Sequence, residues 1–378
     1  MSQSALHVEV ITPYGFDREG DRYRVTRTLP APLRLLPFRM VRSVAVRRNE
    51  ARVLEEARQA ALGGKAVAYV WPDPSLSLLR QLNDAGVPIV REMINCHRGT
   101  AKAILDAEYR RLGLAPQHLI SSESVDSETE ALEYCSDIFC SNSFAERSLI
   151  DNGAPESKVR PVSFGWDPDR FRGHSRALEP IDGPTFVFVG SICVRKGAHL
   201  ILRYWAASGI KGRLVMVGNV EPAIEQVCSE YLRRDDVLVI KYTRDIAPYY
   251  RSADVFVFPS LEEGGPQVTY EAAGCRLPLI TSPMGAGRVA DASTGYVLDP
   301  FDQSGWAEAM QSLAEDAELR RRMGSAAQQR ALQFTWMEVG EARGRVCRQI
   351  ARTAAASSAV RSPGSAVSPS PAQFNARP

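Results

Sequence analysis

The sequence predicts an α/β protein with two Rossmann-like domains, each a doubly wound parallel sheet covered by helices. At 378 residues the chain is long enough for two domains with a core in each. Short apolar runs alternate with helical patterns along most of its length, which is the mark of βαβ units. The stretch 255–280 adds a buried strand, a glycine-containing loop and the start of a helix.

Composition sets broad limits on function. Hydrophobic residues make up 44% and charged residues 24%, as in ordinary globular domains. No apolar run is long enough to span a membrane and the start lacks a signal-like pattern, so we expect a cytoplasmic protein. Seven scattered cysteines and five histidines show no metal-ligand spacing, which predicts no metal site. A net charge of +2 favours no class of partner, and no nucleic-acid motif is found.

The first domain is expected to span residues 1–172. Residues 6–11 predict its first strand, and the loop 12–20 has Gly15 near its turn. The segment from Arg22 to Arg48 contains eight arginines and no acid, with apolar residues interleaved. This pattern fits contact with an anionic membrane surface or acceptor, because cations and apolar groups act together there. A solvated basic strand and loop is the alternative, since prolines 30, 32 and 37 interrupt any long helix.

Further βαβ units follow. A helix at 49–62 precedes strands at 66–70 and 87–91, and a second set comprises an acidic helical stretch at 121–134, a strand at 137–141 and a helix at 144–152. The segment 94–101 leaves a strand at its carboxyl end, where ligands bind in such sheets. It contains His97, beside Asn95, and we consider His97 a candidate site residue although a lone histidine is often structural. A polar linker is expected at 173–184.

The second domain is expected at 185–335. Its first strand, 186–189, is followed by Gly190 and Ser191 and then by Val-Arg-Lys-Gly at 194–197. Lys196, with Arg195 beside it, would place cations at a helix start. The next strand, 213–218, ends near Asn219, and the strand 236–240 ends near Tyr242. A last helix at 336–353 and a disordered tail at 354–378, rich in Ala, Ser and Pro, complete the chain.

The stretch 255–280 carries most of the functional signal. Pro259 ends the strand, Pro266 fits the first position of a helix, and Gly274 fits its end. A helix start beside a parallel strand suits a phosphate, because its N–H groups are unpaired. Glu263 in the loop and Glu271 on the helix would then face neutral hydroxyls. An activated sugar has this combination of diphosphate and hydroxyl groups.

The string Glu263-x7-Glu271, followed by Gly274, Leu277 and Pro278, resembles the signature of glycosyltransferase family 4. Further resemblances are the Gly-Trp-Asp-x-x-x-Phe segment at 165–171 and Phe-Thr-Trp at 334–336. The family has the GT-B fold, in which two Rossmann-like domains face each other across a cleft. The last helix typically crosses back onto the first domain. The resemblance implies a retaining hexosyltransferase that uses a nucleotide-diphosphate sugar.

The resemblance also implies residue roles. Lys196, and Arg195 in place of the family's usual arginine at the position of Ser191, would bind the diphosphate, with Gly190 and the amides of Gly264, Gly265, Gln267 and Val268. Glu263 would bind hexose hydroxyls, Glu271 the ribose diol, and His97 the transferred sugar, while Asn219 and Tyr242 would lie near the base. No metal or cofactor would be needed, and the acceptor would be a glycan, a lipid-linked sugar or a small molecule.

Two alternatives remain open at this point. A nucleotide-sugar epimerase of the same architecture would act on the donor alone. A non-catalytic nucleotide-sugar-binding or scaffold homologue is favoured by the atypical first loop and by Ser191. The sequence leaves the sugar, the base and the acceptor undefined.

Overall fold

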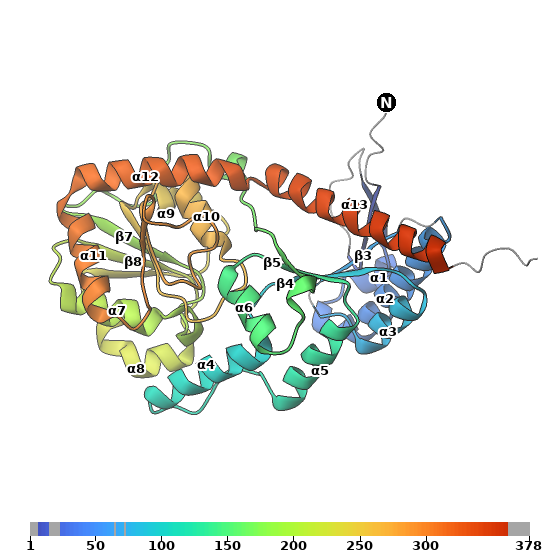
Figure 1. Cartoon of the computed structure of the whole chain (residues 1–378). Helices are drawn as coiled ribbons and strands as arrows, with labels where there is room; N and C mark the ends of the chain where they lie inside the picture. Colours follow the sequence, from blue (N-terminus) through green and yellow to red (C-terminus); the bar gives the residue numbers. More distant parts are fainter. Residues whose placement is uncertain (1–6, 15–22, 64–65, 72, 362–378) are drawn as a thin grey trace, which may run out of the picture.

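The computed structural model describes residues 7–14, 23–63, 66–71 and 73–361, and its strands form three parallel sheets (Figure 1). The first part of the chain contains a two-stranded sheet and a four-stranded sheet of order β3-β4-β5-β6. The strands are β1 (Val8–Thr12), β2 (Tyr23–Arg27), β3 (Ala68–Val70), β4 (Ile89–Met93), β5 (Asp137–Cys140) and β6 (Val159–Pro161). The expected first strand therefore pairs with β2 in a small sheet of its own.

Six helices accompany these strands. They are α1 (Ala31–Arg34), α2 (Phe38–Leu62), α3 (Leu76–Asp84), α4 (Arg98–Arg111), α5 (Ser122–Glu133) and α6 (Ser143–Asp151), and the 3-10 turns η1 (Glu156–Lys158) and η2 (Pro168–Phe171) follow. The expected helix 49–62 is only the second half of α2, which begins directly after Pro37. Proline is tolerated at a helix start, so Pro37 begins this helix rather than breaking it.

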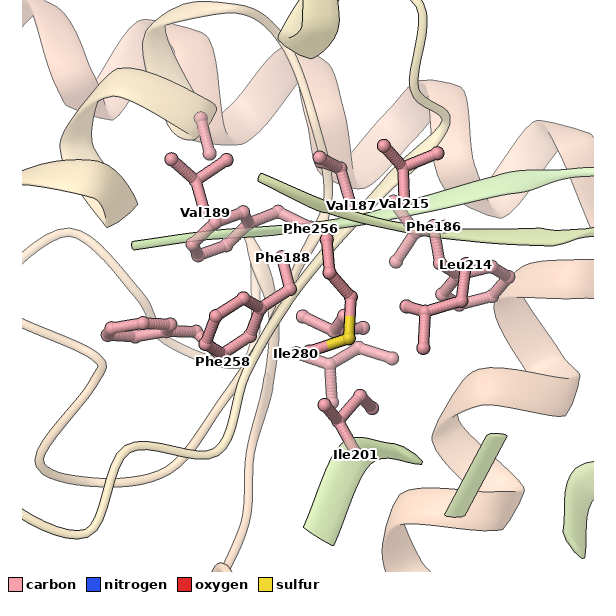
Figure 2. Close-up of a cluster of buried hydrophobic side chains, with 14 of the residues drawn as sticks. Phe186, Val187, Phe188, Val189, Ile201, Leu214, Val215, Phe256, Phe258 and Ile280 are labelled. Atoms are coloured by element: carbon pink, nitrogen blue, oxygen red, sulfur yellow. The ribbon is translucent and has the colours of Figure 1, made fainter. Parts of the chain in front are cut away.

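The remaining sheet has six strands in the order β12-β11-β10-β7-β8-β9. Below, the four-stranded sheet is called the first sheet and the six-stranded sheet the second. They are β7 (Thr185–Val189), β8 (Arg213–Val217), β9 (Val237–Ile240), β10 (Val255–Phe258), β11 (Leu279–Thr281) and β12 (Gly295–Val297). The core of this sheet is mostly apolar, with the phenylalanines of β7 and β10 packed in one cluster with Ile201 and Leu214 (Figure 2). Near-continuous apolar strands are expected where a parallel sheet is covered on both faces.

Helices and short turns cover this sheet. They are η3 (Val194–Lys196), α7 (Ala198–Ser208), α8 (Pro222–Leu232), α9 (Ala247–Arg251), α10 (Gln267–Gly274), α11 (Gln303–Glu315), α12 (Ala317–Ala331) and η4 (Leu332–Phe334). Helix α10 ends in a Schellman motif, in which Leu277 N–H bonds to Ala272 O and Arg276 N–H to Ala273 O. Its left-handed residue is Arg276, with φ 68°, the only non-glycine with positive φ among the described residues. The helix itself ends at Gly274, as expected, and the left-handed residue of its cap comes two positions later.

The last helix, α13 (Trp336–Arg361), crosses from the second sheet to the first (Figure 1). Arg343 pairs there with Glu92 of β4 and donates to Ser163 O at 2.7 Å. Ile350 packs against Val90 and Phe139. The helix extends to Arg361, beyond the expected end at 353, and residues 362–378 lie outside the described part of the chain.

A second contact joins the first half of the chain, which contains β1 to β6, to the second half, which contains β7 to β12, and it involves α4. Glu108 Oε1 of α4 is hydrogen-bonded to Nε2 of His199 in α7 at 2.8 Å, and both side chains are buried. Tyr109 donates to Glu221 at 2.8 Å. These contacts, together with α13, hold the carboxyl ends of β4 and β10 close to each other.

Candidate functional site

The site forms where two loops of the second sheet meet, after β7 and after β10. These strands are hydrogen-bonded neighbours in a parallel sheet, so their carboxyl ends share one edge. Leu261 N–H, after β10, donates to Arg195 O, after β7, at 2.9 Å. Gly197 is left-handed with φ 68°, and an added Cβ would lie 2.0 Å from Pro259 O. Only glycine allows this close approach, which fixes the Arg195–Lys196 turn against the loop.

Lys196 and Glu263 form an ion pair at the centre of the site. Glu263 is 5% exposed, although it lies in a loop. Arg195 Nη1 is 3.9 Å from Glu263 Oε2, and Lys196 Nζ lies over the Phe258 ring at 5.4 Å. Burial, and then the Arg195 charge, lower the pKa of Lys196, whereas the Glu262 charge opposes this shift. The structure thus brings together a carboxylate and two cations at the predicted diphosphate position.

Glu262 is a site residue that the sequence analysis missed. It is 0% exposed and accepts hydrogen bonds from the Cys96 N–H and from Asn95 Nδ2, each at 2.9 Å. Its Oε2 also accepts from Arg195 Nη1 at 3.2 Å. Glu262 therefore joins the segment that follows β4 in the first sheet to the loop that carries Arg195 and Lys196. Nothing in its spacing distinguishes it from the neighbouring Glu263.

Two glycines let this loop pack against the first half of the chain. A Cβ at Gly264 would lie 2.2 Å from the Ile94 carbonyl carbon, and a Cβ at Gly265 would lie 1.7 Å from the Phe164 ring. Neither position has room for a Cβ atom, so each requires glycine. The predicted donor-binding residues Gly264 and Gly265 thus have a packing role as well, at the contact between the two sheets.

Helix α10 carries the second predicted acid. The helix begins at Gln267, and Pro266 is the residue before it rather than its first residue. Pro266 O already accepts from Thr269 N–H at 3.0 Å. The amides of Gln267 and Val268 begin the helix and belong to the N–H groups that no helical carbonyl can pair. This end of α10 follows directly on the loop with Glu263.

Glu271 lies on α10 and is 7% exposed. Its Oε2 accepts from the Tyr250 hydroxyl at 3.2 Å. Burial raises the pKa of Glu271 to about 7, although the Arg170 charge and the Tyr250 hydroxyl both favour the carboxylate. Arg170, which the sequence analysis did not select, is thus a third cation of the site, on the side of Glu271.

The remaining predicted donor residues lie along the same edge of the second sheet. Gly190 closes β7, with φ 131° and its N–H bonded to Val217 O, and the exposed Ser191 follows it. Asn219, after β8, accepts at Oδ1 from Tyr242 N–H at 3.4 Å. Tyr242, after β9, is 68% exposed. The carboxyl ends of β7, β8 and β9 thus present these groups side by side.

His97, which was predicted to lie at the transferred sugar, is buried at the start of α4. It is 1% exposed and precedes α4, where its Nδ1 accepts from Gly99 N–H at 3.1 Å and its Nε2 lies 3.2 Å from Thr129 Oγ1. Burial lowers the pKa of His97, which favours the neutral ring. Both ring nitrogens are engaged within the first half of the chain, so the structure assigns His97 a capping role.

The other predictions for the first domain fall partly outside the described residues. Gly15 and most of the loop 12–20 lie there, as does Arg22. The rest of the basic segment forms β2, α1 and the first half of α2, so the expected basic strand and loop is mostly helical. Leu35, Leu36, Phe38 and Met40 are exposed on it.

Two kinds of feature are absent from the described part of the chain. No cluster of three or more His, Cys, Asp or Glu side chains is suitable for a metal ion. No helix there combines the length and apolarity that crossing a membrane requires.

Sequence comparison connects the second half of the chain to a known family. Residues 170–330 match the family model for glycosyl transferases group 1. A D-inositol 3-phosphate glycosyltransferase from Saccharomonospora viridis is 29% identical over 248 residues, which cover 59% of this chain and 56% of that protein. The chain spans less than two thirds of the length of such curated relatives.

Structural comparison extends the likeness to nearly the whole chain. Sucrose-phosphate synthase from Thermosynechococcus elongatus gives a TM-score of 0.64 at 20% identity, covering 92% of this chain and 90% of that one. Anabaena HepE, solved with UDP and glucose, gives 0.60 at 16% identity and covers 86% of each chain. At these identities the likeness is one of fold, and it confirms the predicted GT-B fold class.

Proposed function

Because the chain carries a glycosyl transferases group 1 domain in a GT-B fold, we propose that it is a retaining glycosyltransferase that moves a hexose from a nucleotide-diphosphate sugar to an acceptor hydroxyl. The observation that carries the proposal is the buried pair of Lys196 and Glu263, next to the start of α10. The likeness to HepE, whose structures contain UDP and UDP-glucose, supports a nucleotide sugar as the donor.

The first step is loss of the nucleoside diphosphate from the sugar. Lys196, Arg195 and the amides of Gln267 and Val268 stabilise the charge that develops on the leaving phosphate. Glu263 would be repelled by the diphosphate, so it binds hydroxyl groups of the hexose instead. The Lys196–Glu263 pair holds both side chains in place before the donor arrives.

The second step is attack by the acceptor hydroxyl on the oxocarbenium-like carbon from the face that the phosphate leaves. The departing phosphate oxygen takes the hydroxyl proton, so the configuration is retained without a protein nucleophile. Glu271 binds the ribose diol, and Asn219 and Tyr242 lie near the base. Contact between the loops of the two halves, through Glu262, excludes water from the reacting carbon.

In this proposal the protein's own cations neutralise the diphosphate, so no metal ion takes part. Transfer is then expected to be unchanged by EDTA. A loss of transfer that Mg²⁺ or Mn²⁺ restores would contradict this part of the proposal and leave the donor site intact.

Turnover of a panel of nucleotide sugars tests the function. Lys196→Ala and Glu263→Ala are each expected to lower transfer about 100-fold or more. Lys211→Ala and Glu225→Ala are the matched controls, because both side chains are exposed and lie away from this site. A scaffold protein would show no turnover in any variant. An epimerase would convert the donor without an acceptor.

We further propose that the acceptor is met at an anionic membrane surface, on the cytoplasmic side. Leu35, after α1, and Phe38 and Met40, in the first turn of α2, are exposed, and Arg39 and Arg42 lie nearby. Apolar side chains with flanking arginines suit the headgroup boundary. Sedimentation with phosphatidylglycerol vesicles is expected to be lost in Leu35→Ser/Phe38→Ser and kept in Lys211→Ala. Equal sedimentation of both variants would exclude this surface.

A further inference from the structure

An open cavity of about 580 Å³ lies on the second domain, away from the proposed donor site. Its walls include the residues just before β10 and β11, the segment 173–176 and the first turns of α12. These walls mark the amino ends of the parallel strands, whereas Lys196 and Glu263 lie at the carboxyl ends. The four residues of β10 alone separate the two ends by roughly 13 Å. The cavity therefore lies at the opposite end of the sheet from Lys196 and Glu263, and its lining residue Tyr250 connects it to Glu271.

The cavity is strongly basic. Five arginines line it, and the lining contains one carboxylate, Asp254, whose Oδ2 already accepts from Thr185 N–H at 2.8 Å. The arginines among the described lining residues are Arg176, Arg251, Arg276, Arg320 and Arg321. Arg321 pairs with Glu318 of its own helix. The remaining cations outnumber the acid and create a positive potential in a concave surface.

Three of these guanidinium groups are oriented by neutral oxygens. Arg251 Nε donates to Ser175 O at 2.7 Å, Arg276 Nη2 to Ser325 Oγ at 2.8 Å, and Arg320 Nη1 to Leu313 O at 2.6 Å. Carbonyl and hydroxyl acceptors fix a guanidinium without neutralising it. Each guanidinium has five N–H donors, so groups with two or three bonds keep donors for a ligand.

The backbone at Arg276 is a second, independent observation. Arg276 occupies the left-handed position of the Schellman motif that ends α10, where glycine is the usual residue. A side chain is disfavoured there, and the arginine at this position directs a guanidinium to the cavity wall. A strained residue that contributes a charged group to a concave surface points to a ligand.

We propose that this cavity binds a soluble anion that carries phosphate groups, separately from the nucleotide sugar. Clustered arginines match the oxygen geometry of phosphate and donate two hydrogen bonds at a time. The bound anion would join the segment 173–176 to α12 and to the turn after α10.

Calorimetric titration with inorganic pyrophosphate tests the proposal. Pyrophosphate could also enter the donor site, so the full-length Lys196→Ala protein serves as the background for every measurement. Saturable binding is expected in this background and in Lys196→Ala/Arg233→Gln, because Arg233 is exposed and does not line the cavity. Binding is expected to weaken about tenfold or more in Lys196→Ala/Arg276→Gly.

The substitution to glycine removes the guanidinium and suits the left-handed backbone, so a loss of binding cannot be attributed to misfolding. Equal affinity in all three proteins, or no saturable binding in the Lys196→Ala background, would overturn the proposal. Sedimentation with phosphatidylglycerol vesicles forms a second arm. Arg276-dependent binding to vesicles without binding to pyrophosphate would likewise overturn the assignment of a soluble ligand.

Discussion

The Glu262 carboxylate accepts a hydrogen bond from the backbone N–H of Cys96 at 2.9 Å, and so joins the loop after β10 to the end of β4. The same carboxylate accepts hydrogen bonds from Asn95 Nδ2 and from Arg195 Nη1. One fully buried side chain thus holds the two halves together and orients the cation beside Lys196. The contact lies between residues 166 positions apart in the sequence.

Glu262→Ala is expected to lower the free energy of unfolding by about 3 kcal/mol, because it leaves the Cys96 N–H and the Arg195 charge without their buried acceptor. Urea denaturation followed by fluorescence measures this. The exposed Glu341→Ala is the control and is expected to change stability by less than about 0.5 kcal/mol. If Glu262→Ala changes the free energy of unfolding no more than this control does, Glu262 does not hold the two halves of the chain together.

Glu271 is expected to make stability depend on pH. Its folded pKa is raised from 4.5 to about 7, so the folded state binds the proton more tightly. The contribution of Glu271 to stability is then greatest below about pH 4.5 and is lost as pH rises through 7, by at most about 3 kcal/mol. Glu271→Gln carries no charge at any pH.

The difference in unfolding free energy between Glu271→Gln and the parent protein should therefore grow in favour of the variant from pH 5 to pH 8. Denaturation at both pH values, with Glu341→Gln alongside, measures it. A constant difference would show that the carboxyl does not titrate in this range. Donor binding by the variant should weaken at both pH values if Glu271 holds the ribose diol.

His97→Ala is expected to affect stability rather than turnover. The substitution removes the cap on Gly99 N–H and leaves a small cavity, which together lower the free energy of unfolding by about 2 kcal/mol. Below the unfolding transition, kcat should stay within about threefold of the parent. A fall of 100-fold with unchanged stability would instead place His97 at the sugar, as the sequence suggested.

Arg276→Gly is expected to stabilise the fold. A non-glycine residue in the left-handed region costs about 1 kcal/mol, and glycine removes most of this cost. The melting temperature in buffer without multivalent anions should rise, with Arg233→Gln as the control. A marked decrease would mean that the Ser325 bonds of Arg276 outweigh the backbone strain.

The sequence by itself determined the local features of this protein. Apolar runs such as 255–258 specify buried parallel strands, and the string around Glu263 and Glu271, with its flanking residues, marks both acids as candidates. Strand and helix patterns depend on neighbouring residues, so they can be recognised from a single sequence.

Only the tertiary structure decided which charged groups meet. It paired Lys196 with Glu263, assigned Glu262 to the β4 edge, engaged both nitrogens of His97 in a helix cap and gathered five arginines at the opposite end of the sheet. These contacts join residues that are remote in the chain, and a lone histidine or glutamate carries no local mark of its partner. Packing between the two halves fixes them, because a buried polar group must find its partner wherever the fold provides one.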